Sequence, residues 1–272
     1  MDKKNTYSVP AVEKAMSILE YITHSKGGRT LKEIYTDLNI SKTTTFSTLR
    51  TLTECGYVRK TSNGLFMPTL KMTMLGAKAR TFAYDSNYVL PKLENLRDTT
   101  GFTVFFCVFD KGEQIVMEKV DGFGGVIFKT VVEQRKHINT SGGGKAMAAF
   151  LSPSELKAVL ERGLKKLTES SIYEEKAFLE HLNVVRKQGY AIDDNEGEMG
   201  VRCIGVPVFM NDGMVYGSVS IATLSEKLNL SDAPKLASHV QAVAMDISKS
   251  LGYRGDSITG KSSNHSRSTG HS

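Results

Sequence analysis

The first third of the chain alternates stretches of helical periodicity with short polar breaks. Apolar residues spaced three and four positions apart predict an amphipathic helix over residues 11–24, which a Gly-Gly pair ends. A capping-box pattern beginning at Thr30 predicts a short helix over residues 31–38, and Ser41 can cap a third helix over residues 42–55. Two β-prone runs then flank an Asn-Gly pair, which is a strong hairpin signal. This order of elements is that of a winged helix-turn-helix.

The rest of the chain predicts a second domain of mixed structure. A helical stretch over residues 69–84 is interpreted as a linker helix, and another helix is expected over residues 88–99. Apolar runs from Phe102 onward predict strands over residues 102–109, 114–120, 125–132, 190–193, 201–209 and 214–222. Helices are expected over residues 143–151, from 153 onward, over 174–188 and over 232–251. The sequence therefore predicts an α+β fold with a mainly antiparallel sheet.

Length and composition fit two globular domains and exclude several classes of protein. The chain has 272 residues, 40% of them hydrophobic, and no run approaches the ~20 apolar residues that span a bilayer. The N-terminal segment lacks the apolar core of a secretory signal, and three widely spaced cysteines form neither a disulfide framework nor a zinc site. The cytoplasm is therefore the expected location, with no membrane partner. Residues 254–272, rich in Ser, Thr and Gly, are expected to be a disordered tail.

The positive charge of the chain is concentrated at its N-terminal end. Residues 1–80 hold 13 Lys and Arg against 6 Asp and Glu, whereas residues 81–253 hold 19 against 22. A basic module joined to a slightly acidic body favours a polyanion as one partner. The expected organisation is a DNA-binding winged helix over residues 8–68, the linker helix, and a second domain over residues 85–253.

The outward face of the third predicted helix carries short hydroxyls and one arginine, which is typical of a helix that reads DNA. Ser and Thr let a helix lie close in the major groove, and Arg50 with the hairpin cations would clamp phosphates. Phe46 lies about 60° from the core direction, which favours a core position over contact with a thymine methyl group. The alternative is a winged helix that contacts protein. The candidate DNA contacts are Ser41, Lys42, Thr43, Thr44, Phe46, Ser47, Arg50, Arg59 and Lys60.

A second candidate site lies in the later domain. The run from His137 to Ala146 is a glycine-rich loop leading into a helix, which binds carboxylates or phosphates through backbone amides or else serves only as a tight turn for packing. An acidic loop over residues 193–198 is interpreted as solvated, since it lacks the spacing of a calcium site. Cys203 is expected in the core, where its thiol can line a pocket. No nucleophile elbow, zinc-protease helix or acid and base pair is present, so neither an enzyme nor a metal or other cofactor is expected.

These patterns together resemble the isocitrate lyase regulator (IclR) family of bacterial transcription factors over residues 8–253. The stretches that carry the resemblance are VPAVEKAMSILEYI, LKEIYTDLNISKTTTFSTLRTLTECGYV, TGFTVFFCVFDKGEQIVMEKV, TSGGGKAMAAFL, VVRKQGYAIDDNEGEMGVRCIGVPVF and AVAMDISKSLGY. The resemblance implies a winged helix that binds a palindromic operator in double-stranded DNA. It also implies a GAF-like domain that binds a small effector, often an organic or aromatic acid, and assembly into dimers or tetramers of identical chains.

The resemblance further implies effector contacts at matching positions of this chain. These positions are Gly142, Gly143, Asp193, Cys203 and Ser220, together with Phe128 at an apolar position of the pocket. The sequence departs from the family pattern at Phe46-Ser47, where the family usually has His-Arg or a similar pair, and this leaves the operator sequence open. It departs again at Asn195 and Ala222, so the effector need not be the commonest one of the family.

The residues and the resemblance together predict a ligand-switched regulator, expected to be a repressor of catabolic or metabolic genes. Effector binding would change how two subunits sit together, and the linker helix would transmit this change to the spacing of the recognition helices. Two alternatives stay open at this point. One is a small-molecule-processing enzyme with an appended winged helix, and the other is a winged helix used only for protein assembly.

Overall fold

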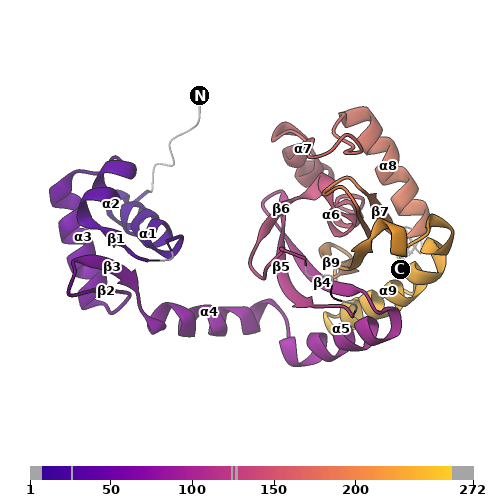
Figure 1. Ribbon diagram of the computed structural model, residues 1–272, viewed down its shortest axis with the longest axis horizontal. Coiled ribbons are helices and arrows are strands. Elements are labelled where there is room, and N and C mark those ends of the chain that lie inside the picture. The colour runs from indigo at the N-terminus through magenta and orange to yellow at the C-terminus, as the bar shows by residue number, and fades with distance from the viewer. Residues whose placement is uncertain (1–7, 26, 124, 126–127, 259–272) are drawn as a thin grey trace, which may run out of the picture. The chain divides into compact units, whose positions relative to one another are not determined.

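The computed structural model divides the chain into two compact units, Met1–Asp85 and Ser86–Ser272 (Figure 1). It describes residues 8–25, 27–123, 125 and 128–258, with residues 80–82 described by their backbone only. Each unit has its own sheet and its own buried side chains. The two units are therefore described separately.

Unit 1, Met1–Asp85, is the winged helix-turn-helix that the sequence predicts. Its helices are α1 Pro10–Thr23, α2 Leu31–Asp37, α3 Lys42–Glu54 and α4 Leu70–Ala83, and its strands are β1 Arg29–Thr30, β2 Val58–Lys60 and β3 Leu65–Pro68. The strands form one antiparallel sheet in the order β1-β3-β2. The sequence does not predict β1, because two residues are too few to show any periodicity.

Capping interactions explain where α2 and α3 begin and where α3 ends. The capping box forms in both directions: Glu33 N donates to Thr30 Oγ1 at 3.2 Å, and Thr30 N donates to Glu33 Oε2 at 2.7 Å. Ser41 Oγ accepts a hydrogen bond from Thr44 N at the start of α3. Gly56 follows α3 with a φ of +76°, a left-handed conformation that glycine adopts at little cost. These local signals confirm the predicted order of helix, turn and helix.

The core of unit 1 lies between α1, α2, α3 and the hairpin. Its buried apolar side chains are Ile18, Leu19, Ile22, Ile34, Leu49, Leu52, Val58 and Phe66. Val12 and Met16, which the periodicity places on the apolar face of α1, are 53% and 51% exposed. The face of α1 that packs against the core therefore includes fewer residues than the apolar periodicity suggests, and Ile18 lies on it.

Unit 2, Ser86–Ser272, is an α+β domain on a six-stranded sheet, as the sequence predicts. Its strands are β4 Thr103–Asp110, β5 Glu113–Val120, β6 Arg135–His137, β7 Ala191–Asp194, β8 Val201–Phe209 and β9 Val215–Leu224. Their order is β6-β5-β4-β9-β8-β7, and every neighbouring pair is antiparallel. Its helices are α5 Ser86–Thr100, α6 Gly142–Ala148, α7 Pro153–Glu161, α8 Glu175–Gln188 and α9 Ala233–Ser250.

Helices cover both faces of this sheet (Figure 1). On one face α5 and α9 pack against each other and against β4, β8 and β9, whereas α6 lies on the other face against β8 and β9, with α8 behind it. Side chains of the strands, such as Val104, Phe106 and Ile204, are fully buried beneath these helices. The short helix α6 is thereby held directly against β8 and β9.

Two predictions about where order and strands occur in unit 2 are wrong. The described residues of 125–132 form no strand, and β6 comes later, at Arg135–His137, where it pairs with β5. An apolar run has no strand period of its own, and here Phe128 packs as part of a loop, 6.3 Å between ring centroids from Phe105. The expected disordered tail is ordered at its start, because Ile258 is buried. The rest of that tail, residues 259–272, lies outside the described residues.

Candidate functional site

The exposed face of α3 is polar apart from one aromatic ring. Phe46 is 55% exposed, so the core position favoured for it is wrong. Its neighbours Thr45 and Leu49 face the core, and Phe46 falls just outside this buried stripe because the helix turns about 100° per residue. Every candidate DNA contact on α3 and its cap is exposed except Thr44, which is half-buried: Ser41, Lys42, Thr43, Thr44, Phe46, Ser47 and Arg50.

Most polar groups on this face are bonded within their own helix. Ser47 Oγ donates to Thr44 O at 3.0 Å, and Thr51 Oγ1 donates to Ser47 O at 3.2 Å. These bonds occupy hydroxyl protons that would otherwise be free for another partner. Arg50 Nε donates to Glu54 Oε1 at 3.0 Å, and such an exposed pair contributes only about 0.3–0.5 kcal/mol. Arg50 is therefore partly neutralised but able to exchange Glu54 for a phosphate.

The hairpin of unit 1 adds two cations. Arg59 and Lys60 lie on β2, and both are exposed. Lys60 Nζ lies 5.7 Å from the centroid of the Phe66 ring, and Arg59 Nη2 lies 3.6 Å from Met67 Sδ. Neither cation forms an ion pair with a carboxylate in the described part of the chain. Both are available to an anion such as the DNA backbone.

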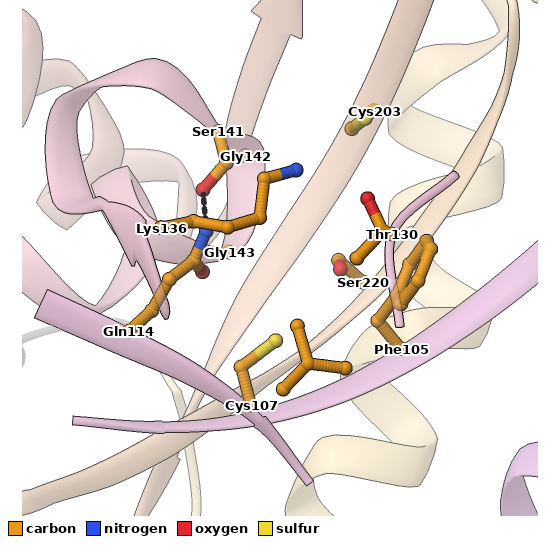
Figure 2. A pocket seen from close by; sticks show the side chains of 11 residues that line it. Phe105, Cys107, Gln114, Thr130, Lys136, Ser141, Gly142, Gly143, Cys203 and Ser220 are labelled. Atoms are coloured by element: carbon orange, nitrogen blue, oxygen red, sulfur yellow. Dashed lines mark hydrogen bonds between the residues drawn. The ribbon is translucent and has the colours of Figure 1, made fainter. Parts of the chain in front are cut away.

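A pocket in unit 2 opens between the glycine-rich loop and the sheet (Figure 2). It holds about 330 Å³ of empty space, including its mouth. Phe105, Cys107 and Val116 form an apolar wall, whereas Gln114 and Lys136 make another side polar. The complete lining is Phe105, Cys107, Gln114, Val116, Thr130, Lys136, Ser141, Gly142, Gly143, Cys203 and Ser220.

The glycine-rich loop approaches the sheet more closely than any side chain would allow. A Cβ at Gly142 would lie 3.0 Å from Gly205 N, and a Cβ at Gly205 would overlap the backbone of Gly142. A Cβ at Gly143 would lie 2.7 Å from Ser218 Oγ. The amide of Gly144 is already taken by the side chain that caps α6. Close packing accounts for Gly144 and Gly205, while Gly142 and Gly143 both pack and line the pocket.

Lys136 is the cation of this pocket. It lies on β6, and Figure 2 shows its ammonium group turned toward the cavity beside Gly142. No carboxylate lines the pocket, and none among the described residues forms an ion pair with Lys136. Gln114, its partner in register on β5, donates from Nε2 to Ser141 Oγ at 2.6 Å. The pocket therefore offers one positive charge and several hydrogen-bonding groups, which suits a small anion.

The two cysteines of the pocket are not activated nucleophiles. Burial raises the pKa of the Cys107 thiol to about 12, and the charge of Lys136 acts in the opposite direction. Burial also raises the pKa of the Cys203 thiol well above its usual value, with Asp193 as a further cause. Both thiols are protonated at neutral pH, whereas the thiolate is the nucleophilic form. In the described part of the chain, no three His, Cys, Asp or Glu side chains are grouped to hold a metal ion.

The acidic segment over residues 193–198, which begins within β7, carries two buried carboxyls, so its interpretation as a solvated loop is wrong. Asp193 and Glu196 are only 3% and 5% exposed. The fully buried Lys145 of α6 is their counter-ion, because its Nζ donates to Glu196 Oε1 and also, at 2.6 Å, to Ile192 O. Burial raises the pKa of both carboxyls, and the charge of Lys145 opposes this rise. The loop therefore anchors α6 to the edge of the sheet.

Comparisons with known proteins match both units to one family. Residues 11–62 match the model described as the IclR helix-turn-helix domain, and residues 86–249 match the model described as bacterial transcriptional regulator IclR C-terminal. The chain belongs to the IclR family.

IclR proteins from several bacteria are similar over nearly their whole length. The HTH-type transcriptional regulator XynR of Escherichia coli K12 is 28% identical over 251 residues, which cover 90% of this chain and 98% of XynR. The DNA-binding transcriptional repressor YiaJ of the same strain is 27% identical over 257 residues, covering 93% and 91%. The crystal structure of Thermotoga maritima IclR has a TM-score of 0.70 at 26% identity, covering 90% of this chain and 99% of that one. As an IclR-family member, the protein is a DNA-binding transcriptional regulator.

One further IclR structure carries a ligand. An IclR homolog from Microbacterium hydrocarbonoxydans, complexed with 4-hydroxybenzoate, has a TM-score of 0.76 and covers 89% of this chain and 98% of its own. Its identity to this chain is 16%, so the likeness shows the fold alone.

Among the described helices, none is long and apolar enough to cross a membrane.

The effector positions implied by the IclR resemblance fall in and around the pocket. Those that line it are Gly142, Gly143, Cys203 and Ser220. Phe128 does not line it but packs against its apolar wall. Asp193 does not line it either; it lies opposite Cys203 in the ladder between β7 and β8.

Sequence reasoning does not single out the remaining lining residues. They are Phe105, Cys107, Gln114, Val116, Thr130, Lys136 and Ser141. Those on β4 and β5 look like ordinary positions of a sheet, because nothing in a strand pattern says which face meets a cavity. Lys136 has one signal, its position just before the glycine-rich loop, but the misplaced strand over residues 125–132 hides its pairing with Gln114.

Proposed function

We propose that this IclR protein is a ligand-responsive repressor that binds a palindromic operator as a homodimer or homotetramer and is switched by a small organic acid. The observation that supports an acidic ligand is Lys136, a cation of the pocket that has no carboxylate partner among the described residues. The relative YiaJ is named a repressor, which supports repression over activation. A small acid as the signal points to catabolic or metabolic genes and to action in the cytoplasm.

The pocket suits a ligand with one carboxylate and an apolar body. Lys136 supplies a single positive charge, and Gln114 lies beside it as a hydrogen-bonding group. Phe105 and Val116 offer the opposing apolar surface. The pocket is a small hollow lined by residues of a few strands and loops, which limits the ligand to a small molecule. The 4-hydroxybenzoate bound by the Microbacterium homolog is an acid of this class.

Exposed apolar side chains of unit 1 support self-association. Val12 and Met16 on α1 are 53% and 51% exposed, and Leu70 and Met74 on α4 are 79% and 64% exposed. Apolar side chains gathered on exposed helices are typical of a protein interface. A two-fold dimer would present the α3 helices to major grooves about 34 Å apart, which is the geometry that a palindromic operator matches.

The proposed switch is a two-state change in how the subunits sit together. A ligand in the pocket would contact the first residues of α6 and the cation of β6, and α4 connects this unit to the winged helix along the chain. A ligand shifts such an equilibrium only by its difference in affinity for the two states. Operator affinity and acid affinity should therefore change each other by the same factor.

The test is a mobility shift of the full-length chain on the DNA upstream of its own gene. The shift is repeated with a panel of small monocarboxylic and dicarboxylic acids and with their amides. An acid that changes the shift while its amide does not supports the proposal. If acids that bind the protein by calorimetry all leave the shift unchanged, the ligand switch is wrong.

The two alternatives differ from this proposal in what they would do in solution. An enzyme would convert the bound acid, which product analysis of the purified protein detects. The protonated thiols of the pocket and the relatives named as regulators argue against one. A winged helix used only for protein assembly would fail to shift any DNA at low salt.

We expect Lys60→Ala to weaken binding to every DNA sequence and to reduce the slope of log affinity against log salt by about one. Lys60 is exposed on β2 and available to a phosphate. Arg50→Ala should have a smaller effect, because Arg50 already shares its charge with Glu54. Fluorescence anisotropy over a series of salt concentrations measures both slopes. Lys249→Ala, an exposed lysine of unit 2, serves as the control, and an unchanged slope in Lys60→Ala would show that Lys60 touches no phosphate.

We expect Gly143→Ala to lose the response to the acid while keeping operator affinity in its absence. The new Cβ would enter the pocket lining 2.7 Å from Ser218 Oγ, a crowding that costs about 1–3 kcal/mol of stability. The double variant Gly143→Ala/Ser218→Ala removes that oxygen and leaves ordinary contacts of 3.4 Å with Gln114 Oε1 and 3.6 Å with the Ser218 Cβ. Thermal unfolding should show recovered stability in the double variant without a recovered response. A double variant that responds fully would remove Gly143 from the ligand site.

A further inference from the structure

We infer that Phe46 reads the methyl group of a thymine in each half of the operator. The inference rests on the DNA-binding role of α3 and names the base that this helix recognises. Phe46 is 55% exposed, and no aromatic, cationic or hydrogen-bonding partner of its ring occurs among the described residues. Exposure of such a large apolar side chain to water is unfavourable, so contact with an apolar group of a partner would stabilise it.

Phe46 lies on α3 at a position where a side chain could contact the bases of DNA. Lys42 and Thr43 lie one turn before it and Arg50 lies one turn after it, and all three are exposed. These side chains therefore surround the ring on one face of the helix. A helix that docked this face in a major groove would bring the ring to the base edges and the cations toward the phosphates.

Several other side chains of the face are already bonded within the helix. The hydroxyls of Ser47 and Thr51 donate to carbonyls of their own helix, and the Arg50 guanidinium is paired with Glu54. The Phe46 ring has no hydrogen-bonding group, so it cannot distinguish bases by their pattern of donors and acceptors. The one apolar group that a base pair presents in the major groove is the C5 methyl of thymine. That methyl is therefore the feature that Phe46 is able to distinguish.

The charge around the ring selects DNA over a protein partner. Lys42 on the same face and the exposed Arg59 and Lys60 on β2 belong to a segment, residues 1–80, that holds 13 Lys and Arg against 6 Asp and Glu. Protein interfaces enclose their aromatic anchors in surfaces depleted of lysine. An exposed ring on the helix that carries Lys42, in a segment with this excess of cations, is matched by a polyanion that presents apolar groups along its groove.

The experiment removes single methyl groups from the DNA. Duplexes that the full-length chain retains are selected from a random library, and each thymine of the selected duplex is then replaced, one at a time, by deoxyuridine. We expect one thymine in each half-site to lose about fourfold in affinity, the value of one buried methyl group. Phe46→Ala should bind the thymine duplex as weakly as the uracil duplex, so that the ratio of the two affinities becomes one. The control Leu230→Ala, an exposed apolar residue of unit 2, should keep the wild-type ratio.

Each outcome decides the inference. A wild-type ratio of one at every thymine, or a ratio that survives in Phe46→Ala, overturns it. If Phe46→Ala instead changes the molar mass of the free protein in light scattering and the ratio survives, the ring belongs to a protein interface. Retention of no DNA at all would refute the operator-binding proposal itself, so the two failures are distinct.

Discussion

Replacing Lys136 with methionine is expected to weaken binding of the acid by about 10- to 100-fold and to abolish the response of the operator complex to it. Methionine keeps the apolar stem of the lysine and removes only the ammonium group that faces the pocket. A hydrogen bond to a charged group contributes about 1.5–3 kcal/mol, which corresponds to that loss of affinity. Calorimetry of the full-length protein with the acid found active in the mobility shift measures it. Operator affinity without the acid should stay unchanged, because Lys136 lies in unit 2.

Two controls separate the charge of Lys136 from general damage. Lys129→Met changes an exposed lysine that does not line the pocket, and it should bind the acid as the wild type does. The wild type should also distinguish the acid from its amide, whereas Lys136→Met should not. An unchanged acid affinity in Lys136→Met would show that another group holds the carboxylate.

The second large effect is expected in stability. Lys145→Met should lower the free energy of unfolding by about 3–5 kcal/mol, because it leaves a buried charge without its partner. Lys145 is fully buried, donates to Glu196 and opposes the raised pKa of Asp193 as well. Urea unfolding at neutral pH measures the loss. A loss below about 1 kcal/mol would contradict the role of Lys145 as the counter-ion of this loop.

The pH dependence of the Lys145→Met variant follows from the same geometry. Burial raises the pKa of Glu196, and removal of Lys145 takes away the charge that opposes this rise. The folded variant then holds a proton that the unfolded chain releases above its ordinary pKa of about 4.3. Its stability should therefore fall as the pH rises above that value, and more steeply than the stability of the wild type does. The double variant Lys145→Met/Glu196→Gln removes the carboxylate and should recover most of the stability and lose the pH dependence.

The winged helix was predictable because its signals are local. The capping box at Thr30, the left-handed Gly56 after α3 and the Asn63-Gly64 hairpin turn each act within a few residues. The strand over residues 125–132 was not predictable in the same way. An apolar run packs equally well as a strand or as a loop against a sheet, and only the neighbouring β5 decides that β6 forms at Arg135–His137.

The sequence by itself determined the order of the elements, the basic first module, the glycine-rich loop and the family. These depend on short-range spacing and on composition. Tertiary structure alone decided that Phe46 is exposed, that Lys136 faces a cavity, and that Lys145 and Glu196, 51 positions apart, form a buried pair. The physical reason is that burial and charge pairing depend on which distant segments pack together. No local pattern encodes that packing, so the acidic loop looks solvated in the sequence and is a buried anchor in the fold.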